Sequence, residues 1–164
     1  WIMSQAGRLK DDLNEYFDGF SVNREEGWDV VIHCRQGDYL SNPNVFKNYG
    51  VISDNYYYKV LEFLNDFGVS NVVVTSDSFI PATHPLATYP LIEEVLERSK
   101  VEAQAIVSFC RASKIFVGSN STLSWWSSFL ADDSRLEFFP RFWSRSFRFH
   151  GRGLYLPKWR LVEN

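Results

Sequence analysis

The 164-residue chain is predicted to be an α/β fold, a Rossmann-like parallel sheet flanked by helices. Short runs of β-branched and other apolar residues at 30–32, 72–74 and 115–117 are typical of strands buried on both faces. Between these runs, apolar residues repeat every three or four positions, as they do along amphipathic helices. Strands that alternate with helices favour a parallel sheet. The length suits one domain, residues 1–164.

The N-terminal part of the chain begins with helical spacing. Apolar residues three and four positions apart predict an amphipathic lead-in helix within residues 1–24, and a strand follows at 29–34. Residues 36–52 contain glycine, proline and asparagine and are predicted to be a long loop. A loop of this length directly after a strand is typical of a binding element.

The middle of the chain repeats the order of strand and helix. Ser53 and Asp54 can cap a helix that ends near Gly68, and the strand at 72–74 comes next. Residues 80–90 contain several prolines, which lack the backbone N–H that regular structure needs, and are predicted to be irregular.

The C-terminal part adds further alternating elements before its pattern fades. The predicted elements are helices at 91–99, 101–112 and 123–130, and strands at 115–117 and 136–139. Helix 123–130 contains Trp125 and Trp126, and one of the two rings is expected in the core because successive helix positions cannot both face a cleft. His84 and His150 have no partner at a ligand spacing and are predicted to be surface residues.

The tail at 141–164 is basic and aromatic, and arginine alternates with aromatic residues around Arg145, Arg148 and Arg152. Three interpretations stay open for it: a solvated surface or subunit contact, a nucleic-acid surface, and an arginine that reaches an anionic ligand. The formal net charge of −3 argues against nucleic acid as a partner of the whole chain.

The amino-acid composition limits the classes of protein to which the chain can belong. Aromatic residues make up 17% of the chain, which implies a large buried interface or a cleft lined with rings. Cys34 and Cys110 are too few for a disulfide framework and are predicted to be reduced core thiols. No apolar run approaches the ~18 residues of a membrane span.

Three predicted strands end in residues that can bind an anion. Arg35 and Asp38 follow the first, Ser76 and Asp77 the second, and the polar turn 119–122 the third. Ligands of parallel sheets bind at this edge. A guanidinium grips phosphate with two prongs, and a polar turn before a helix offers N–H groups and hydroxyls. A simple helix cap by Ser121 or Thr122 is the other interpretation of that turn.

Two motifs also carry a family resemblance. Residues 33–39, His-Cys-Arg-Gln-Gly-Asp-Tyr, resemble the His-x-Arg-Arg-Gly-Asp-Tyr signature of α-1,2-fucosyltransferases, glycosyltransferase family 11. Residues 119–126, Ser-Asn-Ser-Thr-Leu-Ser-Trp-Trp, are similar to the Asn-Ser-Ser-Phe-Ser-Trp-Trp segment of its bacterial members. The resemblance covers about residues 29–130, and the pair of motifs is more specific than either alone.

The resemblance implies the C-terminal, donor-binding half of a GT-B glycosyltransferase that binds GDP-fucose. Arg35 would hold the diphosphate, and His33 and Asp38 would brace Arg35 and the turn at Gly37. The implied donor-binding residues are His33, Arg35, Gly37, Ser76, Asp77, Ser119, Asn120, Ser121 and Thr122, and the implied catalytic residues are Arg35 and Asp38, the nearest candidate for a general base.

The implied reaction is an inverting, metal-independent transfer of L-fucose to a glycan hydroxyl, without a cofactor. The chain contains no Asp-x-Asp pair that could hold a divalent ion against a diphosphate, which agrees with a metal-independent reaction. There are two alternatives. The donor is a different nucleotide sugar, or the chain is a donor-binding fragment or subunit that is inactive by itself. A missing N-terminal domain or a homo-oligomer is a further expectation, since the chain starts at Trp1 and is shorter than family members. For a bacterial or viral protein, a reducing cytoplasmic compartment is favoured. For a eukaryotic catalytic fragment, the Golgi lumen is expected.

Two positions depart from the family pattern. Gln36 stands where the family has a second arginine, and Ala103 stands where a helix usually opens with an acid. The first departure predicts weaker donor binding, a slower reaction, or a substitute cation.

Overall fold

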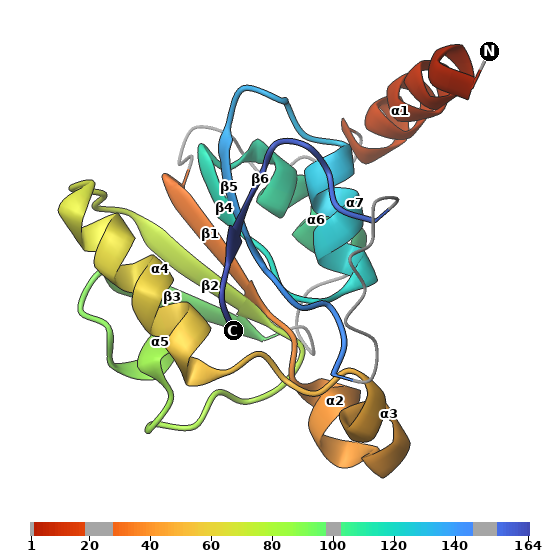
Figure 1. The fold of residues 1–164 in the computed structure, drawn as a ribbon. Helices are drawn as coiled ribbons and strands as arrows, with labels where there is room; N and C mark the ends of the chain where they lie inside the picture. The colour runs from red at the N-terminus through yellow and green to blue at the C-terminus, as the bar shows by residue number, and fades with distance from the viewer. Residues whose placement is uncertain (1, 19–27, 98–102, 146–153) are drawn as a thin grey trace.

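The computed structural model describes residues 2–18, 28–97, 103–145 and 154–164. In these residues six strands form one sheet in the order β3-β2-β1-β4-β5-β6, and every neighbouring pair is parallel (Figure 1). The strands are β1 Val30–Cys34, β2 Val72–Ser76, β3 Ile92–Glu97, β4 Ile115–Val117, β5 Leu136–Pro140 and β6 Trp159–Val162. The predicted Rossmann-like sheet is therefore confirmed.

Helices cover both faces of the sheet (Figure 1). They are α1 Ile2–Asp18, α2 Gly37–Ser41, α3 Pro43–Asn48, α4 Asp54–Asp66, α5 Pro85–Thr88, α6 Ala103–Ala112 and α7 Thr122–Phe129. Alternate strand residues point to opposite faces, so Val30 and Ile32 pack on the side of α4, whereas Val31 packs on the side of α6. Among the described residues, no helix has the length and apolarity needed to cross a membrane.

The strand order produces a crevice just outside the carboxyl ends of the paired strands β1 and β4. The chain adds β2 and β3 on one side of β1, then returns to place β4 on the other side. Ligands of open α/β sheets bind at such a switch point, just past the carboxyl ends of the strands. Arg35 directly follows β1, and the turn 118–121 directly follows β4, so the fold brings both predicted anion-binding segments to this crevice.

The predicted helix at 91–99 is wrong, because residues Ile92–Glu97 form edge strand β3. A register shift between Val72 and Val73 of β2 interrupts the regular pairing with β3. The shift also interrupts the strict alternation that identifies a strand, so Leu91, Val95 and Leu96 match a helical period instead.

Short elements also occupy segments predicted to be irregular. The predicted loop 36–52 contains α2 and α3, and Asn42 caps α3 by accepting hydrogen bonds from the N–H groups of Asn44 (3.0 Å) and Val45 (3.3 Å). The tail 141–164 contributes β6, which pairs with β5. Glycine, proline and asparagine are common in loops, but they are also common at the ends of helices, so they do not distinguish the two.

The structure decides several side-chain predictions. Cys34 and Cys110 are free, buried thiols, as predicted. His84 is buried rather than exposed, since its ring accepts a hydrogen bond from the N–H of Leu86 (3.1 Å) at the start of α5. His150 lies outside the described residues.

Candidate functional site

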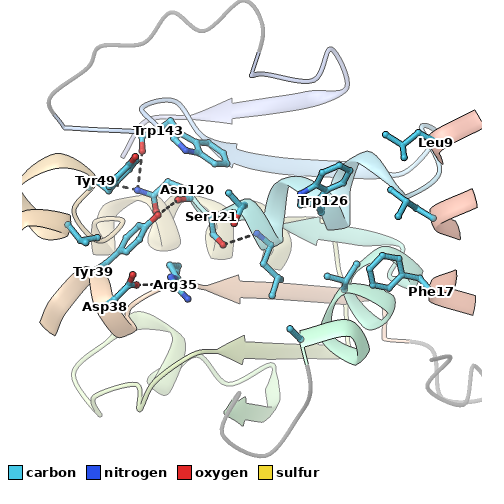
Figure 2. Close-up of a pocket in the computed structure, with 16 residues that line it drawn as sticks. Leu9, Phe17, Arg35, Asp38, Tyr39, Tyr49, Asn120, Ser121, Trp126 and Trp143 are labelled. Carbon is cyan, nitrogen blue, oxygen red and sulfur yellow. Dashed lines mark hydrogen bonds and ion pairs between the residues drawn. The ribbon is translucent and has the colours of Figure 1, made fainter. Parts of the chain in front are cut away.

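A cavity of about 910 Å³ lies beside the carboxyl ends of β1 and β4 and continues along α7 (Figure 2). One end is polar, lined by Arg35, Asp38, Tyr39, Tyr49, Asn120, Ser121 and Thr122. The other end is apolar, lined by α1, α6 and α7 through Leu9, Leu13, Phe17, Val107, Leu123 and Trp126. The polar end therefore combines residues from both predicted motifs.

Arg35 occupies the polar end between two carboxylates. Its Nη2 lies 2.5 Å from Oδ1 of Asp38, and its Nη1 lies 2.6 Å from Oδ2 of Asp77. The guanidinium also lies over the ring of Tyr39, 5.2 Å from the centroid. The side chain is 20% exposed and lines the cavity. Arg35 is thus fixed in orientation and still reaches the cavity.

Asp77 anchors the turn that carries Arg35. Its Oδ1 accepts hydrogen bonds from the backbone N–H groups of Gln36 (2.7 Å) and Gly37 (3.1 Å), while its Oδ2 pairs with Arg35. A Cβ at Gly37 would lie 2.3 Å from that Oδ2, so only glycine leaves room for this contact. Asp77 therefore holds the Arg35 side chain in place.

Ser76 is buried, and its hydroxyl accepts a hydrogen bond from the N–H of Ser78 (3.3 Å). Neither Ser76 nor Asp77 lines the cavity. Their predicted contact with the donor stays a prediction, and the described contacts give both a role in the turn beneath the cavity.

A buried network joins the two motifs. His33 Nδ1 lies 2.6 Å from the hydroxyl of Ser124 and 3.1 Å from that of Ser119. The backbone N–H of Ser119 donates to the Ser124 hydroxyl (3.0 Å). His33 and Ser119 thereby tie the end of β1 to the turn after β4.

Asn120 connects that turn to two other segments. Its side-chain Nδ2 donates to the carbonyls of Gly50 (3.2 Å), Trp143 (3.2 Å) and Tyr49 (3.4 Å). Its own carbonyl accepts a hydrogen bond from the hydroxyl of Tyr39 (2.8 Å), as Figure 2 shows. Burial raises the pKa of Tyr39 to about 12, so this hydroxyl stays a donor at neutral pH.

A cleft lined with rings was one of two expectations from the composition, but the residues that form the aromatic wall of the polar end were not predicted. The rings of Tyr39 and Tyr49 stack at 5.7 Å between centroids, and Trp143 lies beside them in the cavity wall. Tyr39 belongs to the first motif, but nothing in the sequence pairs it with Tyr49 ten residues later. The contact depends on the fold of α2 and α3, which the sequence did not predict.

Helix α7 points its N-terminus at the same end of the cavity. The hydroxyl of Ser121 caps the helix by accepting from the N–H of Leu123 (3.2 Å), and Thr122 is exposed at the first position. The first turn of a helix carries partial positive charge and attracts anions. Cap and anion site are therefore compatible interpretations of this turn.

The two tryptophans of α7 have different environments. Trp125 packs in the core, stacks on Phe129, and donates its indole N–H to the carbonyl of Leu154 (2.8 Å). Trp126 is 39% exposed and lines the apolar end of the cavity. One ring is in the core as predicted, and the other faces the cleft.

The tail arginines are only partly described. Arg145 lies over the ring of Phe46 of α3, 4.5 Å from the centroid. Arg148 and Arg152 lie outside the described residues, so a substitute cation from the tail stays a prediction. Within the described ranges, no three His, Cys, Asp or Glu side chains gather as a metal site would require.

Comparison with known proteins indicates the family of the chain. The model of glycosyl transferase family 11 matches residues 8–163. The chain belongs to this family. It is also 33% identical over 115 residues to the O-antigen biosynthesis glycosyltransferase WbnK of Escherichia coli. That match covers 68% of the chain and 38% of the relative, so the chain spans well under half of that relative's length. No solved structure matches the chain.

Family 11 is a family of glycosyltransferases, so the resemblance seen in the sequence is confirmed.

The two departures from the family pattern have clear positions. Gln36 is buried, and within the described part of the chain its Oε1 has no hydrogen-bond donor. Ala103 begins α6 and lines the cavity. Neither position supplies a second cation or an acid to the cavity.

Proposed function

We propose that the chain binds the donor of an inverting, metal-independent glycosyltransferase that moves L-fucose from GDP-fucose to a glycan hydroxyl. The observation that carries this proposal is the meeting of Arg35 with the first turn of α7 at one end of the cavity. Both groups attract phosphate, and both lie at the switch point of the sheet. The family of the chain supports sugar transfer as the reaction.

The reaction needs positive charge next to the diphosphate, which is the leaving group. An acceptor oxygen forms a bond to the anomeric carbon, the bond to the diphosphate breaks, and its electron pair leaves with GDP. Arg35 and the backbone N–H groups in the first turn of α7 offset this growing negative charge. One well-placed donor of this kind contributes ~3–4 kcal/mol to lowering a barrier.

The acceptor side is inferred from the cavity and from the relative. Asp38 is 50% exposed and lines the cavity, and we assign it as the candidate base that takes the acceptor proton. A glycan acceptor agrees with the name of the relative WbnK, which refers to O-antigen biosynthesis.

A second candidate donor is another nucleotide sugar. Arg35 and a helix terminus recognise phosphate and do not select a base or a sugar. The alternative therefore keeps the same site and changes only the rest of the ligand.

A thermal-shift panel with GDP, UDP and ADP at equal concentration tests the proposal. A ligand at 100 times its Kd stabilises the folded state by ~2.7 kcal/mol, which is about 5–10 °C in Tm for a chain of this size. We expect the largest shift with GDP, and fucose transfer when GDP-fucose and a glycan acceptor are added. A larger shift with UDP or ADP selects the second candidate, and no shift with any of the three contradicts both.

A further inference from the structure

The polar end of the cavity carries more negative than positive charge. Arg35 is the cation among the described residues that line the cavity, whereas Asp38 lines it too and Asp77 lies directly behind Arg35. One guanidinium and two carboxylates sum to −1. A diphosphate brings further negative charge, so it cannot pair well with Arg35 while both carboxylates hold their places.

The two carboxylates differ in how firmly they are held. Asp77 is 7% exposed, and both of its oxygens are engaged, one by Arg35 and the other by two backbone N–H groups. Asp38 is 50% exposed and pairs with Arg35 through Oδ1. Rotating Asp38 breaks one surface contact and returns a carboxylate to water. Moving Asp77 breaks three contacts at once.

We infer that Asp38 is the exchangeable partner of Arg35, and that the donor diphosphate takes the Nη2 contact that Asp38 makes in this structure. The inference rests on the proposed function, because it needs a diphosphate ligand at this end of the cavity. Arg35 stays in place during the exchange, since Asp77 holds Nη1 and the Tyr39 ring supports the guanidinium face. Only the Asp38 side chain has to rotate.

Exchange and bracing predict opposite effects of removing the Asp38 carboxylate. If Asp38 braces Arg35 for the ligand, its loss weakens diphosphate binding. If Asp38 competes with the ligand for Nη2, its loss strengthens binding. Asp77 is the contrast, because losing the fixed carboxylate releases Arg35 and the turn at Gly37, and binding should weaken.

The test is the Kd of GDP measured by calorimetry for the wild type, Asp38→Asn and Asp38→Ala at one fixed ionic strength. Exposed ion pairs are weak, so we expect GDP to bind about two- to fivefold more tightly to both variants. The matched control is Asp54→Asn on α4, which removes the same charge from a carboxylate that is 59% exposed and does not line the cavity. It should leave the Kd unchanged.

Three results would overturn the inference. Folded Asp38 variants that bind GDP equally or more weakly than the wild type would show that Asp38 is a brace and would leave the proposed function intact. An equal decrease of the GDP Kd in Asp54→Asn would show that the effect comes from the net charge of the protein and not from the contact of Asp38 with Arg35. A wild type that binds no nucleoside diphosphate would overturn the proposed function together with the inference.

Discussion

Replacing Gly37 with alanine should damage the site through a single added methyl group. The new Cβ would lie 2.3 Å from Oδ2 and 3.0 Å from Cγ of Asp77. That carboxylate cannot retreat cheaply, because it holds Arg35 and the N–H groups of Gln36 and Gly37. The backbone at Gly37 does not have a positive φ, so the effect is steric and not conformational.

The magnitude follows from the loss of packing. Inserting a methyl group into a well-packed site costs ~1–3 kcal/mol. For a chain of this size each kcal/mol lowers Tm by about 2–4 °C, so we expect a fall of roughly 5 °C. Because Arg35 loses its fixed partner, the stabilisation by GDP should also be lost.

Thermal unfolding with and without GDP measures both effects. The matched control is Gly7→Ala on α1, where a Cβ meets nothing within 4 Å. It should keep the wild-type GDP shift, and its Tm should stay equal or rise slightly, because alanine favours a helix more than glycine does. A Gly37→Ala protein that melts and responds to GDP like the wild type would refute the proposed role of Asp77.

Three further predictions concern the core and the cavity wall. Glu137→Gln leaves the buried Arg135, 2.6 Å away, without its carboxylate, and we expect urea denaturation to show a loss of ~3–5 kcal/mol. Burial raises the pKa of the Cys34 and Cys110 thiols to about 12, whereas unfolded thiols release their protons near pH ~8.5. The free energy of unfolding should therefore fall as pH rises from about 9 to 12. In a variant with both cysteines replaced by alanine, this fall should be less steep. Asn120→Ala removes a donor from three carbonyls, and urea denaturation should show ~1–3 kcal/mol lost.

The sequence predicted the framework of the fold from local signals. Runs such as 30–32 and 115–117 are apolar on both faces and became central strands. The edge strands β3 and β6 were missed, because one side of an edge strand lacks a neighbour and its residues need not be apolar. Val95 and Leu161 are exposed accordingly. Strand identity at the edge depends on pairing, which no local pattern records.

The sequence predicted which segments form the candidate site, and the structure adds how their side chains are held. Arg35 and the turn 119–122 meet as predicted, since both follow parallel strands. The donor contacts predicted for Asp77 and Ser119 stay predictions, and the structure adds that both residues hold neighbouring protein groups. A polar residue at a strand end can face the ligand or support the residue that does, and only the fold distinguishes these roles.

The most direct test of the central claim is the GDP affinity of Arg35 variants. Arg35→Ala removes the guanidinium, and Arg35→Lys keeps the charge but loses the fork, in which Nη1 pairs with Asp77 while Nη2 is left for the diphosphate. We expect GDP binding to fall at least tenfold in the lysine variant and to vanish in the alanine variant, with both proteins folded by circular dichroism. Wild-type affinity in a folded Arg35→Ala protein would contradict the claim that this guanidinium holds the diphosphate.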